Sequence, residues 1–223
     1  PVEGDTKVTV EGTNFADTGV VLGKFGLTAA TSCTRASDTK IECTSPAEAA
    51  GSRALEITVD DVTYLSTPGS VVYTSDGKPF HHYDQPTFSA IVPPRGPIGG
   101  GTSVRIVGTN IVETTGDAII VKVGTKEVGG RYVSPTEIGC DAVPSVDSAA
   151  SAEVYVLLNG QQQSTAKIDY AYYTSPVVET VDPVLGPVRG TQKVTVSTKA
   201  TAGMVRNDAD FALYTKCKFG DET

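Results

Sequence analysis

Apolar and polar residues alternate over short stretches along the whole chain, and Gly, Asn, Asp and Pro separate these stretches. Val8 and Val10 form one such pair, and the spacing recurs at Val104/Ile106 and Val194/Val196. Alternation with a period of two predicts strands with one buried face, and frequent turn residues predict that the strands are short. The pattern therefore predicts an all-β fold.

Three segments of the chain repeat one another. The intervals between their first residues are 96 residues (1 to 97) and 90 residues (97 to 187). The repeated openings are Pro1–Val8, Pro97–Val104 and Pro187–Val194. Later matches are Lys24-Phe25-Gly26, Lys122-Val123-Gly124 and Lys218-Phe219-Gly220, and then Ile41–Pro46 and Ile138–Pro144. Repetition at a fixed period indicates an array of similar structural units.

Each repeat reads as a sandwich of about seven short strands. A hairpin is expected in each of the first two copies, with turns at Asp60-Asp61 and at Asn159-Gly160, and the final strands at Val71–Tyr73 and Ile168–Tyr173. The predicted organisation is a first domain at 1–74 that lacks its opening strand, a linker insertion at 75–85, a complete domain at 86–174 and half of a third domain at 175–223. Because Pro1 replaces an initiator Met and the ends cut across domains, we expect a fragment of a longer array.

The run from Pro93 to Asn110, followed by Lys122-Val123-Gly124 and Ile138-Gly139-Cys140, resembles the IPT/TIG family. These immunoglobulin-like domains occur in plexins, transcription factors and microbial surface proteins, and they are similar to filamin repeats. The resemblance implies tandem immunoglobulin-like β-sandwiches of the IPT/TIG type. It also implies a disulfide between a Lys-Cys-Lys-Phe-Gly segment and a later Ile-x-Cys segment. Here the matching cysteines, Cys217, Cys43 and Cys140, lie in different copies, because Gly23 and Val121 stand at the first position.

Cys33 and Cys43 flank a turn near Ser37-Asp38, and antiparallel pairing about that turn places them opposite one another. They are the disulfide candidate, with two buried free thiols as the alternative. Cys140 has no partner in its own domain, and Cys217 is expected to pair beyond Thr223. A lone Cys140 and the absence of any Asn-x-Ser/Thr sequon count against an extracellular placement.

The linker insertion contains four residues that we expect at an interdomain joint: Phe80, His81, His82 and Tyr83. Aromatic side chains in such a segment are expected to pack between domains, with a partner-binding patch as the alternative. The two histidines would then lie at the elbow of a stiffened rod and loosen it on protonation near pH ~6. A metal site is disfavoured, because adjacent residues point apart and no further ligands have suitable spacing.

Composition excludes several other functions. The 26 acidic and 18 basic residues give a formal net charge of −8, and the basic residues are scattered, which excludes nucleic acid. Gly99-Gly100-Gly101 lacks the Lys-Ser/Thr of a phosphate loop. Solvated turn residues are the favoured interpretation of Asp60, Asp61 and Asp208, and calcium ligands are the less favoured one. No apolar run approaches a membrane span. No catalytic residue, cofactor or metal site is predicted.

The favoured function is a non-catalytic structural or adhesion array that presents protein-binding surfaces on a cell surface or a large assembly. Its expected partners are other proteins or neighbouring domains of the same chain, and its expected location is extracellular or at the cell surface. One alternative is an intracellular filamin-like or ciliary scaffold. A carbohydrate-associated module of a secreted enzyme is disfavoured because Trp is absent and aromatic residues make up 7% of the chain. A dimerising transcription-factor domain is opposed by the acidic charge and the tandem repetition.

Overall fold

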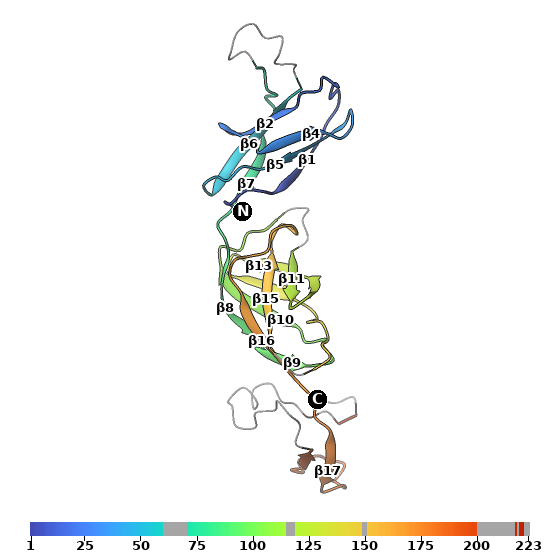
Figure 1. The fold of residues 1–223 in the computed structure, drawn as a ribbon. Helices are drawn as coiled ribbons and strands as arrows, with labels where there is room; N and C mark the ends of the chain where they lie inside the picture. Colours follow the sequence, from blue (N-terminus) through green and yellow to red (C-terminus); the bar gives the residue numbers. More distant parts are fainter. Residues whose placement is uncertain (60–70, 115–118, 149–150, 200–216, 218, 221–223) are drawn as a thin grey trace.

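The computed structural model of the chain shows units that lie end to end (Figure 1). It describes residues 1–59, 71–114, 119–148, 151–199, 217 and 219–220. Strands form the regular structure of these residues, which confirms the all-β class. No helix among them is long and apolar enough to cross a bilayer.

The middle unit is a two-sheet sandwich. One sheet has the order β13-β14-β10-β8, and the other has the order β12-β11-β15-β16-β9. Its strands are β8 (Thr87–Val92), β9 (Arg95–Pro97), β10 (Val104–Thr109), β11 (Ile120–Val123), β12 (Lys126–Gly129), β13 (Arg131–Ser134), β14 (Glu137–Cys140), β15 (Ser151–Leu157) and β16 (Ile168–Tyr173).

These nine strands exceed the expected seven, partly because the opening segment changes sheets. β8 pairs with β10, and β9 pairs in parallel with β16 in the opposite sheet. Pro93 and Pro94 lie between β8 and β9, and neither can donate a ladder hydrogen bond. The two prolines therefore separate the opening segment into one strand for each sheet.

The core of the middle unit follows the alternation in the sequence. The five side chains expected to be buried are at most 2% exposed: Val104, Ile106, Ile138, Val154 and Val156. They belong to one apolar cluster between the two sheets. The predicted strand register is therefore confirmed for this unit.

The first unit repeats this arrangement with fewer strands. Its sheets have the orders β1-β5-β4 and β3-β2-β6-β7. Its strands are β1 (Lys7–Glu11), β2 (Leu22–Phe25), β3 (Thr28–Ala29), β4 (Ser32–Arg35), β5 (Lys40–Thr44), β6 (Gly51–Thr58) and β7 (Lys78–His82). In this part of the chain no counterpart of β8 flanks β1, so β1 pairs with β5 alone.

The boundary between the first two units differs from the prediction. The segment 75–85 is not a linker insertion, because β7 pairs with β6 along its whole length, from Gly51↔His82 to Leu55↔Lys78. The predicted final strand at Val71–Tyr73 is not a strand. Val71 and Tyr73 have the alternating pattern of a strand, but the segment that pairs with β6 is Lys78–His82.

This correction makes the two joints equal in length. Val2 N–H donates to the Tyr83 carbonyl at 2.9 Å, and Ile98 N–H donates to the Tyr173 carbonyl at the same distance, so Tyr83 and Tyr173 are equivalent. Three positions separate each tyrosine from the next unit's proline, Pro86 or Pro176. The extra residues of the first repeat therefore lie between β6 and β7. Because the two linkers have the same length, linker length gives no reason to expect the second joint to be stiffer than the first.

The third segment begins another copy of the unit. β17 (Val178–Asp182) pairs with β18 (Thr195–Thr198). Val181 faces Val196 there, as Ile91 faces Ile106 in the middle unit. Backbone conformation repeats as well, since Gly26, Gly124 and Gly220 have φ values of 61°, 60° and 60°. A positive φ at the turn explains why each repeat carries Gly there.

Candidate functional site

The joint between the first two units is the best-defined candidate for a functional region. A cleft of about 570 Å³ lies there. Its walls come from the end of β7 in the first unit and from the loop after β10 in the second unit. Interfaces between domains are common places for clefts of this size.

All four predicted joint residues line this cleft. They are strand residues and the residue that follows the strand, and not members of an insertion. Phe80 packs edge-on against Phe25 of the first unit, with ring centroids 4.9 Å apart. Tyr83 packs against the apolar cluster of the second unit. The two aromatic residues therefore stabilise different sides of the joint, and His81 is exposed beside them.

His82 is a core residue of the first unit. It is 3% exposed, and its Nε2 lies 3.2 Å from the Pro46 carbonyl. Its Nδ1 is buried without a hydrogen-bond partner among the described residues. Burial lowers the pKa of His82, against the smaller raising effects of the Pro46 carbonyl and Glu48. The neutral imidazole is therefore the favoured form in the folded unit.

Gln85 connects the two units across the short linker. Its Nε2 donates to the Glu3 carboxylate at 2.9 Å, and its Oε1 accepts from Thr165 N–H at 3.4 Å. Its carbonyl accepts from Asn110 Nδ2 at 3.2 Å. One side chain therefore contacts both units, which limits independent rotation of the linker.

The turn after β15 supplies further contacts to the first unit. Gln161 and Gln162 reach the backbone of Asp5 and Lys7, and Asn159 reaches Thr6. The sequence analysis recognised Asn159-Gly160 only as a hairpin turn. The three consecutive glutamines after it were the available signal, because a turn of this kind does not require them.

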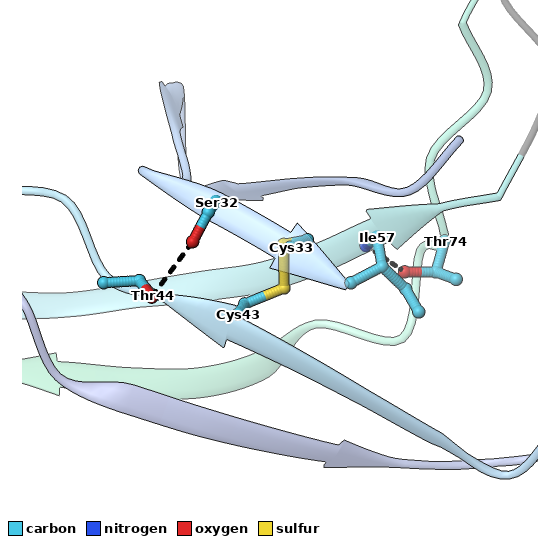
Figure 2. The surroundings of a disulfide bond; sticks show 6 residues. All are labelled: Ser32, Cys33, Cys43, Thr44, Ile57 and Thr74. Carbon is cyan, nitrogen blue, oxygen red and sulfur yellow. Dashed lines mark hydrogen bonds between the residues drawn. A yellow bond between two sulfur atoms is a disulfide. The ribbon is translucent and has the colours of Figure 1, made fainter. Parts of the chain in front are cut away.

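The Cys33–Cys43 disulfide lies between β4 and β5 of the first unit (Figure 2). The two Cα atoms are 4.1 Å apart, and the residues are direct partners in the β4–β5 ladder. Ser32 Oγ donates to Thr44 Oγ1 at 3.1 Å beside the disulfide. The same figure shows Ile57 N–H and Thr74 Oγ1 on its other side, 3.1 Å apart.

Gly23 on β2 makes room for this disulfide. A Cβ at Gly23 would lie 2.6 Å from Cys33 Sγ and 3.1 Å from Cys43 Sγ. The second unit fills the equivalent space with different residues. Its Cys140 is a buried free thiol, Val121 replaces Gly23, and Gly130 replaces Cys33. Burial raises the pKa of the Cys140 thiol and keeps it protonated. Cys217 is free and exposed.

Other candidates from the sequence do not assemble into sites. Among the described residues, no group of three or more His, Cys, Asp or Glu is arranged to hold a metal ion. Gly99–Gly101 leads from β9 into β10, and not into a helix. Asp60, Asp61 and Asp208 lie outside the described residues.

Comparison with known families agrees with the repeat architecture. The profile of the IPT/TIG domain matches residues 1–74 and 86–172, which together are most of the chain. The chain belongs to the IPT/TIG domain family. Its first two units are therefore tandem IPT/TIG domains of immunoglobulin-like fold.

Similar proteins include members of the plexin group. The chain is 24% identical to "Plexin A3" of Danio rerio over 208 residues, and 25% identical to "Plexin-A4" of Homo sapiens over 209 residues. Each match covers 88% of this chain but only 10% of the relative. The solved full extracellular region of Plexin A4, domains 1 to 10, superposes with a TM-score of 0.54 at 21% identity, covering 90% of this chain and 19% of that one. The superposition shows that the tandem units share their fold with this region of Plexin A4.

Proposed function

We propose that this chain is a non-catalytic extracellular segment of a cell-surface protein, in which IPT/TIG domains hold protein-binding surfaces at set positions. The observation that carries the proposal is the cross-strand Cys33–Cys43 disulfide, with Gly23 fitted beneath it. Disulfides persist in oxidising compartments and are rare in the cytosol. The extracellular plexin region with a similar fold supports the same placement.

The mechanism is geometric. Each sandwich is a rigid body with its own apolar cluster, and the units lie end to end (Figure 1). Sheet edges and end loops remain as contact surfaces for other proteins or for neighbouring domains. The partner's position is then set by the number of units and by the angles between them.

Surface labelling of cells that express the full-length protein tests the placement. A membrane-impermeant amine reagent should label exposed lysines of this segment, such as Lys7 and Lys126, on intact cells. Alkylation without reductant should leave Cys33 and Cys43 unmodified while Cys140 reacts after denaturation. Labelling that requires permeabilised cells, together with free Cys33 and Cys43, would instead support the intracellular scaffold.

A further inference from the structure

The side chain of Gln161 pairs with the backbone of Lys7 as a neighbouring strand would. Its Oε1 accepts from Lys7 N–H at 2.9 Å, and its Nε2 donates to the Lys7 carbonyl at 3.0 Å. A primary carboxamide offers donors and an acceptor, as a peptide group does. One side chain therefore satisfies both backbone groups of a residue in another domain.

Lys7 is the first residue of β1, and its backbone groups face the second unit. The preceding residue, Thr6, uses its carbonyl to accept from Ser45 N–H on the β5 side at 2.9 Å. Polar groups of successive strand residues point to opposite sides, so those of Lys7 point away from β5. Gln161 therefore satisfies the two backbone groups of Lys7 that do not bond to β5.

Gln162 makes a second attachment next to the first. Its Nε2 donates to the Asp5 carbonyl at 2.8 Å, and its Oε1 accepts from Thr6 Oγ1 at 3.2 Å. Three consecutive residues of the first unit are thus held by two consecutive residues of the second unit. A rotation of one unit against the other would break several of these hydrogen bonds together.

Asn159 holds both glutamines in place. Its Oδ1 accepts from Gln161 N–H at 3.1 Å and from Gln162 N–H at 3.2 Å. Its Nδ2 donates to Gln162 Oε1 at 2.6 Å and approaches Thr6 Oγ1 at 3.4 Å. Asn159 and Thr6 are 6% and 7% exposed. The turn is therefore organised around a buried amide that also contacts the first unit.

We propose that Asn159, Gln161 and Gln162 form an amide clamp, which fixes the angle between the first two domains. The clamp acts with the Gln85 bridge and with a linker of only a few residues. This inference concerns how the joint is held and does not depend on the compartment. The surface-labelling experiment therefore tests the proposed function and does not test the clamp.

Amide hydrogen exchange on the full chain tests the pairing of Gln161 with Lys7. Gln161→Ala removes both hydrogen bonds to Lys7, so the exchange of the Lys7 amide should accelerate about tenfold or more, the change expected for one lost hydrogen bond. Gln163→Ala is the matched control, because Gln163 lies in the same turn but accepts from Lys122 Nζ within the second unit. Unchanged exchange at Lys7 in Gln161→Ala would overturn the role of Gln161 in the clamp.

Residual dipolar couplings test the fixed angle. In the wild type and in Gln163→Ala, the two domains should share one alignment tensor, and in the Gln161→Ala, Gln162→Ala double variant the tensors should diverge. Gln161→Glu is the second variant, because it keeps an acceptor for Lys7 N–H but places a carboxylate against the Lys7 carbonyl, and it should also loosen the joint. Tensors that stay equal in the folded double variant or in Gln161→Glu would overturn the clamp.

Discussion

At the scale of single residues, two packing solutions occupy the same place in the first two repeats. In the first domain a disulfide lies over Gly23. In the second domain Val121 occupies the equivalent position, opposite Gly130 and Cys140. A Cβ at Gly130 would lie 3.0 Å from Val121 Cγ2 and 2.8 Å from Ile119 Cγ2. Ile119 and Val121 together therefore exclude a cysteine side chain at position 130 by volume.

This exclusion predicts the result of exchanging the two solutions. The Ile119→Val, Val121→Gly, Gly130→Cys triple variant copies Val21, Gly23 and Cys33 of the first domain. It should form a disulfide with Cys140, because Gly130 continues the Arg131↔Gly139 register to a position opposite Cys140. Intact-mass analysis without reductant should show the loss of two hydrogens, about 2 Da, in most molecules. Gly130→Cys alone should oxidise much less, since Ile119 and Val121 remain. Equal oxidation of the two variants would contradict the volume argument.

His82 predicts a pH dependence for the stability of the first domain. Its pKa is lowered in the folded state by burial, whereas an unfolded His titrates near pH ~6.5. Between the folded and unfolded pKa values the unfolded chain binds more protons, so stability falls as the pH drops below ~6.5. Urea unfolding of the first domain, followed by its NMR signals, should give a lower free energy at pH 5.5 than at pH 7.5.

His82→Gln and His81→Gln separate the two histidines. The pH dependence should shrink in His82→Gln and persist in His81→Gln, because His81 is exposed. The groups that face His82 include Glu48, Arg53 and the Pro46 carbonyl. An undiminished pH dependence in His82→Gln would assign the effect to other groups. Because His82 belongs to the first domain's core, the expected effect is on folding and not on an elbow between domains.

At the scale of elements, the strand at Lys78–His82 is the main difference from the sequence-based organisation. Its side chains alternate between the core and the solvent, so Phe80 and His82 pack near Phe25 while His81 is exposed. A linker would not require this alternation. The consequence is that substitutions on this segment should alter the stability of the first domain itself.

Phe80→Ala tests that consequence. Because Phe80 is half-buried against Phe25, its truncation should lower the unfolding free energy of the first domain by about 1–3 kcal/mol, less than for a fully buried Phe. His81→Ala on the same strand should change it by less than about 0.5 kcal/mol. Chemical denaturation of the full chain provides the measurement. Equal effects of the two variants would indicate that the segment is only a linker and does not pack into the first domain.

At the scale of the whole molecule, the first two domains have separate apolar clusters, and among their described residues only the first domain has a disulfide. Contacts at the joint are mainly hydrogen bonds from Gln85 and the amide clamp. Polar contacts of this kind fix an angle without merging two cores. The domains should therefore unfold as two units that share one orientation when folded.

Reduction of the chain should affect these units unequally. The disulfide joins residues separated by 10 positions, and opening a loop of that size should cost the first domain about 2–3 kcal/mol. The second domain has no disulfide among its described residues and should keep its unfolding midpoint, which makes it the internal control. Domain-resolved thermal unfolding with and without reductant measures both. A parallel loss in the two domains would show that they unfold as one.

The sequence by itself determined the strand-rich class, the three repeats and the core of the second domain. These features follow from local alternation and from turn residues, so Val104, Ile106 and Val154 could be assigned to the interior before any pairing was known. The Cys33–Cys43 pairing was also accessible, because a short hairpin fixes which residues face each other.

Only the tertiary structure decided the final strand of the first domain and the contacts of the joint. Val71–Tyr73 and Lys78–His82 both have strand-like patterns, and the choice between them depended on which one pairs with β6 and brings Phe80 to Phe25. The run of glutamines at Gln161 and Gln162 marks the turn as unusual but does not identify its partners, which lie more than 150 positions away. Pairings over such distances arise when folded units meet, and no local pattern encodes them.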